Sequence, residues 1–549
     1  MPSTVTRPLA DLDRTIAGAR RLDLGLLAAC LVAAIPMLYL AAHQFVEYDG
    51  FWHVFIAQQD NWRNFWWEYM HNDHPLLFYL MLRAVMKLGH SVLIYRSISV
   101  ASGLGCVYVI GKITGKLSVS KIAPVFTALA FGVAIPTLEI AISVRSYMLS
   151  TFFIVLSFYY FLDLLPVEGA APTRRARILF AVSAILAVCS HYFAFFYVGT
   201  CTVVVAGFGL ARPRLFKNAW VAHLFTFVPI FLVMACLYRF HISYNTTNLN
   251  HVPDYLWGPG EPKVKFLARN FHSLFNFFSP WQIVDRRHFE KVGALLVAAA
   301  IGLTPWKRLR RAIPLIMLSL IVVELAVAGC LDRYPFGGFL RQQFIVFPFA
   351  VLAAGICLDR ILSLIHIRAL VWASAAVLFV TLIAVAVSRF NAYPKASGEL
   401  FTREMNLFDA AIPSPAGMYT DQFNLIGIYT QRHQWNWTFV ERLPMPTEVE
   451  EYVLTRDSKR VKLLRDKLRW NLDFSDASLY HDLAVSMRLA KLNSLAVFCV
   501  HQGEGTLTPA QQDALEQKAF TLAKAEDLQI QKFVPDGLNI YAEFARGGQ

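Results

Sequence analysis

The stretch Leu22–Ala42 reads LDLGLLAACLVAAIPMLYLAA and follows the basic pair Arg20-Arg21. An apolar run of about 20 residues has the length that a helix needs to cross a bilayer. No small-residue cleavage site is evident beside it, so we expect a retained first helix behind a cytoplasmic segment at 1–21. Further apolar blocks lie at 92–111, 122–140, 147–165, 178–195, 196–211, 218–239, 290–306, 312–331, 342–359 and 369–388. The sequence therefore predicts a polytopic α-helical membrane protein.

The overall composition points the same way. Of the 549 residues, 56% are hydrophobic and 16% charged, and the mean hydropathy is +0.45. A soluble globular domain carries about 25% charged residues. This difference excludes an ordinary soluble enzyme over most of the length, and it excludes a disordered chain. The eight cysteines occur singly, without a CxxC pair, which predicts no disulfide framework.

The linkers between the apolar blocks are of two kinds. Short basic linkers, such as 112–121 and 307–311, contrast with long aromatic ones at 43–91, 240–289 and 332–341. The two kinds alternate if the chain crosses the membrane eleven times with the basic set in the cytoplasm. The net charge of +13 then reflects topology, and no basic-aromatic groove indicates nucleic acid as a partner.

Eleven membrane crossings lead to three further predictions. The block 178–211 must form two short passes broken near Ser190-His191. The stretch 75–90 is short and contains Arg83 and Lys87, so we expect it to lie along the outer interface as an amphipathic helix. An odd number of crossings places everything after residue 389 outside the cytoplasm.

The chain divides by composition into the segment 1–21, a transmembrane domain at 22–391 with large outer loops at 43–91 and 240–289, and a soluble α/β domain at 392–549. Periodicity in the last part predicts a helix over Thr447–Trp470 and a buried strand over Ser494–Val500. Thr508-Pro509 is typical of a helix start. Two closing strands are expected at about 528–533 and 538–544, around the turn Pro535-Asp536-Gly537.

Titratable residues gather in the first outer loop. Its sequence runs Glu47-Tyr48-Asp49-Gly50-Phe51-Trp52-His53, and later His71-Asn72-Asp73-His74-Pro75. Partial desolvation at the membrane boundary raises the pKa of a carboxylate toward useful base strength. An aromatic belt at the membrane interface explains Trp62, Trp66 and Trp67 better than a catalytic role does. It does not explain so many acidic residues and histidines in the same loop.

Six motifs in this order resemble a known family. They are Asp49 after the first span, His74-Pro75, Tyr95-Arg96, Ser143–Tyr147, His191-Tyr192, and Tyr334–Gly338 with Arg341. The order is similar to the GT-C glycosyltransferases, especially the bacterial branch of protein O-mannosyltransferases and the lipid A aminoarabinose transferase. The likeness covers about residues 20–390. Gly50 replaces the usual acidic neighbour and Leu76 the usual second proline, so the subfamily and its sugar stay open.

The resemblance implies a GT-C-like fold and inverting transfer of a sugar from polyprenyl phosphate. The acceptor is a lipid, a glycan or a protein on the outer, periplasmic face of a bacterial cytoplasmic membrane. Asp49 is the expected base, with Glu47 and Asp73 as competitors. Donor phosphate is assigned to Arg145, Arg341, His191 and Arg333, with Arg96 and Lys265 as lesser candidates, because guanidinium binds phosphate bidentately. Substrate contacts are expected from Glu47, His53, His71, Asp73, His74, Glu139, Tyr147 and Tyr334.

Each of these assignments has a simpler alternative. A boundary arginine can snorkel to the interface, Glu139 can form an ion pair with Arg145, and His191 can be a core histidine. A metal at His71, Asp73, His74 and Asp49 lacks a recognised ligand spacing, so no metal or other cofactor is expected to be required. Glu324 inside an apolar block is a functional or a packing residue.

Two other function classes remain as alternatives. A transporter or flippase of lipid-linked sugars typically has inverted repeats and helices broken near the membrane midplane, whereas here no repeat is found and the polar residues gather on one side. A scaffold whose soluble tail binds a partner explains the tail but not the polar cluster of the first loop.

Overall fold

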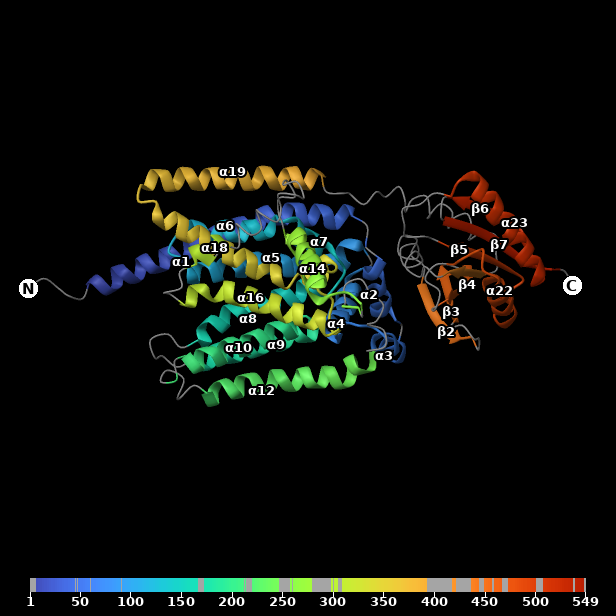
Figure 1. The fold of residues 1–549 in the computed structure, drawn as a ribbon, viewed down its shortest axis with the longest axis horizontal. Coiled ribbons are helices and arrows are strands. Elements are labelled where there is room, and N and C mark those ends of the chain that lie inside the picture. The colour runs from blue at the N-terminus through green and yellow to red at the C-terminus, as the bar shows by residue number, and fades with distance from the viewer. Residues whose placement is uncertain are drawn as a thin grey trace, which may run out of the picture. The chain divides into compact units, whose positions relative to one another are not determined.

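The computed structural model describes the chain except for residues 1–5, 45, 47, 60, 90, 166–171, 212, 214–219, 246–256, 259, 279–297, 300, 305–308, 393–416, 421–435, 444–448, 457–458, 467–471, 500–506, 537–538 and 548–549. Contacts group the chain into two units (Figure 1). Unit 1 holds Met1–Gln44 and Glu68–Tyr393, and unit 2 holds Phe45–Trp67 and Pro394–Gln549.

Unit 1 is helical, and Figure 1 shows most of its long helices running along a common direction. Its elements are α1 (Thr6–His43), the end of α3 (Trp62–Met70), α4 (Leu76–Val85), η1 (Met86–Leu88), α5 (Val92–Leu117), α6 (Ile122–Gly132), α7 (Ile135–Ile142), α8 (Tyr147–Leu164), α9 (Arg174–Ser190), α10 (Ala194–Ala211), α12 (Trp220–Leu237), the π-turn η2 (Tyr238–Ile242), α13 (Ser243–Asn245), α14 (Lys263–Phe278), α16 (Leu309–Cys330), α17 (Leu340–Gln343), α18 (Val346–Leu364) and α19 (Arg368–Ala392).

Eight of the described helices are long and apolar enough to cross a membrane. The pair α6 and α7, bent by 56°, raises the number to nine if it is one span. The predicted span at 178–195 is the 17-residue α9, and the one at 290–306 lies largely outside the described residues. The protein is a multi-pass membrane protein, while eleven crossings stay a prediction.

The break predicted within 178–211 is confirmed. Helix α9 ends at Ser190, His191 is its C-cap, and α10 begins at Ala194. The stretch predicted to lie along the interface forms the ten-residue α4, which is not among the candidate spans of the described chain. Between spans, hydroxyls join helices: Ser150 Oγ donates to Ala187 O at 2.9 Å, a contact typical of membrane bundles.

Unit 2 is an α/β domain joined by part of the first loop. That loop contributes α2 (Tyr48–Gln58) and most of α3, and the domain contains β1 (Gly417–Thr420), β2 (Asn436–Arg442), β3 (Val449–Arg456), β4 (Lys459–Asp466), α22 (Ala477–Leu489), β5 (Ser494–Cys499), α23 (Pro509–Ala525), β6 (Leu528–Asp536) and β7 (Asn539–Arg546).

The seven strands form one sheet in the order β2-β3-β4-β1-β5-β7-β6. Strand β1 runs parallel to β4 and β5, and the other pairs are antiparallel. The predicted strand at Ser494–Val500, the two closing strands and the helix start at Thr508 are confirmed, the last with a capping box to Gln511.

The helix predicted over Thr447–Trp470 is wrong, because this stretch contains the antiparallel strands β3 and β4. Both faces of these strands are buried, at Val449 and Leu464 on one side and Tyr452 and Leu463 on the other. A strand buried on both faces loses the simple alternation of apolar and polar residues. Its apolar positions then imitate a helical spacing.

Candidate functional site

Three segments that lie far apart in the sequence bring their rings together in unit 1. The Tyr147 ring at the start of α8 lies 4.4 Å from the His191 ring, between centroids. The His74 ring before α4 lies 5.1 Å from His191 and 5.8 Å from Tyr147. Each of these residues was a predicted substrate or phosphate contact, and the structure places them in one cluster.

Arg145 adds a positive charge to this cluster. Its side chain is buried, its Nη1 donates to Tyr147 Oη at 3.4 Å, and its carbonyl accepts from Ser99 Oγ at 3.2 Å. Residues 143–146 form a non-helical link between α7 and α8, so Arg145 lies two residues before the start of α8. Helix N-termini carry partial positive charge and attract anions. The buried Ser146 hydroxyl there has no hydrogen-bond partner among the described residues.

His191 is oriented by the break between α9 and α10. Its backbone is extended, with φ −155° and ψ 141°, and its Nδ1 accepts the Phe193 N–H at 3.1 Å. In the neutral ring the proton is then on Nε2, which makes that atom a hydrogen-bond donor. Phe193 also packs edge-on against the imidazole, at 4.4 Å between centroids.

The entry into α4 is fixed by Asn72. Its Oδ1 accepts from Tyr79 Oη at 2.6 Å and from the His74 N–H at 3.2 Å. Tyr79 is fully buried, and burial raises its pKa well above the ordinary value, with a smaller effect from the exposed Asp73 carboxylate. The phenol therefore stays protonated and holds Asn72, which positions His74.

A second network, of hydrogen bonds, begins at Tyr192, the residue after His191. It was not predicted from the sequence. Tyr192 Oη donates to His241 Nδ1, and His241 Nε2 donates to Tyr69 O at 3.1 Å. The Tyr69 and His241 rings stack at 4.5 Å. His241 lies in the π-turn η2, a geometry frequent at functional sites. The available signal was a histidine just beyond the predicted span at 218–239. His71 joins nearby, with its Nε2 3.4 Å from Tyr244 Oη.

The segment before α18 contributes Tyr334. Its hydroxyl donates to Gln342 O at 3.1 Å, and its ring packs on Phe196 at 5.1 Å. Burial raises the pKa of Tyr334 well above its ordinary value, and the Tyr147 side chain adds to this effect. Gly337 has φ +69°, and a Cβ there would lie 2.2 Å from Asn270 O. Only glycine fits this turn.

The remaining predicted residues belong partly to unit 1 and partly to unit 2. Arg341 Cζ lies 4.7 Å above the Phe339 ring. Arg96 is buried and its Nη1 donates to Ala41 O and Gln44 O at the end of α1. Exposed positions are occupied by Arg333, Glu139, Lys265 and Asp73.

Asp49 and His53 lie on α2 in unit 2. His53 is buried, and its Nδ1 donates to Asp49 O at 2.7 Å. Asp49 itself is half-buried in the first turn of α2. Glu47 lies outside the described residues. Among the residues that the structure describes, no three His, Cys, Asp or Glu side chains form a group able to hold a metal ion.

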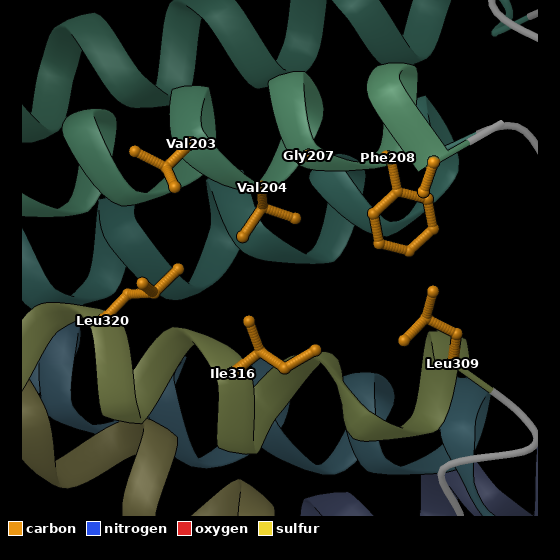
Figure 2. Close-up of a pocket in the computed structure, with 8 residues that line it drawn as sticks. Val203, Val204, Gly207, Phe208, Leu309, Ile316 and Leu320 are labelled. Atoms are coloured by element: carbon orange, nitrogen blue, oxygen red, sulfur yellow. The ribbon is translucent and has the colours of Figure 1, made fainter. Parts of the chain in front are cut away.

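An apolar cavity lies between α10 and α16 (Figure 2). Its volume is about 270 Å³, and its lining is Val203, Val204, Gly207, Phe208, Ala211, Leu309, Ile316 and Leu320. Farther along the same helix pair, Glu324 faces Gly199, where a Cβ would lie 3.3 Å from Glu324 Oε2. Glycine therefore leaves room for this carboxyl between the two helices.

No protein-family model and no curated protein sequence matches the chain. The crystal structure of apo ArnT from Cupriavidus metallidurans matches with TM-score 0.52 and 12% identity, over 94% of this chain and 97% of that chain. The same protein bound to undecaprenyl phosphate matches with TM-score 0.43 and 14% identity, over 70% and 69%. The Archaeoglobus fulgidus oligosaccharyltransferase complex with Zn and sulfate matches with TM-score 0.48 and 11% identity, over 85% and 67%. Both proteins are GT-C glycosyltransferases. The apo ArnT match shows that this chain has a GT-C-like fold.

Proposed function

We propose that the chain is an inverting glycosyltransferase that moves a sugar from a polyprenyl-phosphate donor to an acceptor outside the cytoplasmic membrane. The observation that carries this proposal is the cluster of Arg145, His74, His191 and Tyr147, formed where α4 and α8 begin and α9 ends. The GT-C-like fold supports it, and the ArnT protein with that fold was crystallised with undecaprenyl phosphate.

The chemistry of the cluster suits a lipid phosphate. Attack at the anomeric carbon expels the phosphate, so negative charge grows on its oxygens in the transition state. A buried guanidinium, the α8 N-terminus and an Nε2–H of His191 all favour that charge. A single charge-assisted hydrogen bond of this kind contributes about 1.5–3 kcal/mol.

The attacking acceptor group loses a proton as the sugar is transferred, and a base must lie within about 3 Å of it. We assign this role to Asp49, in the first turn of α2. We assign donor phosphate to Arg145, Arg341, His191 and Arg333. Contacts to sugar and acceptor are assigned to Glu47, His53, His71, Asp73, His74, Glu139, Tyr147 and Tyr334.

The decisive experiment is reconstitution of the full chain in lipid vesicles with polyprenyl-phosphate sugars. Mass spectrometry follows release of free polyprenyl phosphate and the mass gain of added lipid, glycan or peptide acceptors. We expect release only with a matching acceptor, and loss of it in Arg145→Ala but not in Arg360→Ala, an exposed arginine of α18. Movement of intact donor across the vesicle membrane without release would instead identify a flippase.

The orientation is tested separately. Fusing a reporter that is active only in the cytoplasm to Gln549 should give no signal, because eleven crossings place the C-terminus outside. A cytoplasmic signal would show that the number of crossings is even.

A further inference from the structure

Helix α2 of the first outer loop is buried almost all round. Phe51, His53, Val54, Phe55 and Ile56 are each at most 3% exposed. A short helix with this burial is held by its surroundings and not by its own propensity. The contacts made by its side chains therefore decide where its first turn lies.

Two aromatic residues on one face of α2 contact the sheet of the same unit. Trp52 and Phe55 are one turn apart, with ring centroids 5.7 Å from each other. The Arg465 guanidinium of β4 lies over the indole, with Cζ 4.3 Å from its centroid. The Phe55 ring meets the Tyr452 ring of β3 edge-on at 5.7 Å. Both are favourable aromatic geometries that strengthen when water is excluded.

On the sheet side of this contact, Glu450, Tyr452 and Arg465 form one hydrogen-bonded polar group. Glu450 and Arg465 are directly opposite each other in the β3–β4 register, and Arg465 Nη1 donates to Glu450 Oε2 at 3.0 Å. Tyr452 Oη donates to the same oxygen at 2.7 Å. The exposed fractions of Glu450, Tyr452 and Arg465 are 0%, 1% and 6%. A buried ion pair is costly to desolvate, so its presence here is better explained by positioning than by stability.

The other face of the sheet is used differently. Val449 and Leu464 of the same two strands belong to the core formed with α22 and α23. Glu450 and Arg465 each follow one of these two residues directly, so they point to the opposite face because successive side chains of a strand alternate. One face thus holds the domain together, and the opposite face holds α2.

We propose that the C-terminal domain serves as a positioning support for α2, with Arg465 as the positioning residue that holds the helix through Trp52. Asp49 precedes Trp52 by one turn, so the same contact fixes the first turn that carries the carboxylate. This inference rests on the proposed role of Asp49 for its effect on turnover, but not for its effect on the helix.

The test uses the full chain and the double variant Arg465→Met with Glu450→Gln. The variant removes the stacked guanidinium without leaving a lone buried carboxylate. The matched control is Lys462→Met with Glu451→Gln, which removes another ion pair of β3 and β4, at 3.0 Å, on the face away from α2. Hydrogen exchange is measured for peptides covering α2, with α22 and α23 peptides reporting whether the domain stays folded.

We expect exchange in α2 to rise by roughly tenfold in the Arg465 variant and to stay unchanged in the control. The turnover number should fall by a similar factor while the KM for donor stays within about twofold. A smaller fraction of folded protein would give the same kinetic pattern, so the exchange of the α22 and α23 peptides, expected to stay at the wild-type level, distinguishes the two causes. Arg465→Lys should lie between, because an ammonium cannot stack flat on indole.

Unchanged exchange in α2, or an equal rise in the control, would overturn the proposal. If α22 and α23 also lose protection, Trp52→Leu tests the contact from the helix side with the ion pair intact, and the same rise in α2 exchange is required. If the wild-type protein transfers no sugar, the proposed function fails while the exchange result still decides the role of Arg465.

Discussion

The first outer loop contains two short helices, α2 and α4, that belong to different units of the molecule. Helix α4 lies with the membrane helices, and its entry is fixed by the Tyr79–Asn72–His74 contacts beside Tyr147 and His191. Helix α2 lies with the soluble domain through Trp52 and Phe55. The residues proposed to bind phosphate thus belong to unit 1, and the residue proposed as the base belongs to unit 2.

This division has a physical consequence for mutations. Substitutions near α4 should act mainly on donor affinity, since the groups there are the ones proposed to bind the phosphate before and during transfer. Substitutions on α2 should act mainly on turnover, since a base matters only when the acceptor loses its proton.

The largest effect is expected for Asp49→Asn. The substitution is nearly isosteric but removes a strong proton acceptor, so turnover should fall by roughly 10²-fold or more with donor affinity near wild type. Initial rates and donor binding in vesicles measure the two quantities. Asp73→Asn and Glu47→Gln test the two competing carboxylates, and loss of turnover in either, with normal turnover in Asp49→Asn, would move the role of base to that residue.

A smaller effect, on affinity, is expected for Arg341→Ala. Loss of a bidentate phosphate partner should weaken donor binding by about 1.5–3 kcal/mol, or roughly 10- to 150-fold, with acceptor binding unchanged. Arg341→Lys should recover only part, because an ammonium cannot reproduce the fork. Equal donor dissociation constants for wild type and Arg341→Ala, by calorimetry in detergent, would remove this residue from the site.

Tyr79→Phe should have a modest effect on the α4 side. It deletes the hydroxyl that donates to Asn72 Oδ1 at 2.6 Å, at a cost of about 1 kcal/mol, so donor affinity should fall severalfold. The midpoint temperature of thermal unfolding should change little. Tyr95→Phe, at a fully buried tyrosine of α5, is the matched control for loss of a buried hydroxyl. A donor affinity equal to wild type would show that Asn72 does not position His74 for binding.

The smallest effect on catalysis is expected for Thr508→Ala. This change removes the capping box of α23 and should lower the free energy of unfolding of the C-terminal domain by about 1 kcal/mol. Turnover should stay at wild-type level, since α23 packs on the face of the sheet away from α2. A drop in turnover as large as that of the Arg465 variant would mean that the position of α2 depends on the overall stability of the domain and not on one contact.

Local signals in the sequence were enough for much of the architecture. Apolar length alone located spans such as Leu22–His43 and Val92–Leu117, because a bilayer demands about 20 residues of helix whatever the helix contacts. The break after Ser190 followed from charge alternation, and the α23 start followed from Thr508-Pro509. The order of polar motifs along the chain was sufficient to indicate the GT-C-like fold.

Tertiary structure decided what depends on contacts between distant segments. The spacing in Thr447–Trp470 predicted a helix, but neighbouring strands on both sides and burial of both faces made it a hairpin of β3 and β4. Nothing local marks His241 as the partner of Tyr192, or Arg465 as the partner of Trp52, since these pairs are separated by 49 and about 400 residues. Periodicity reports which side of an element is buried, whereas the identity of the partner is set only when the folded chain brings the two surfaces together.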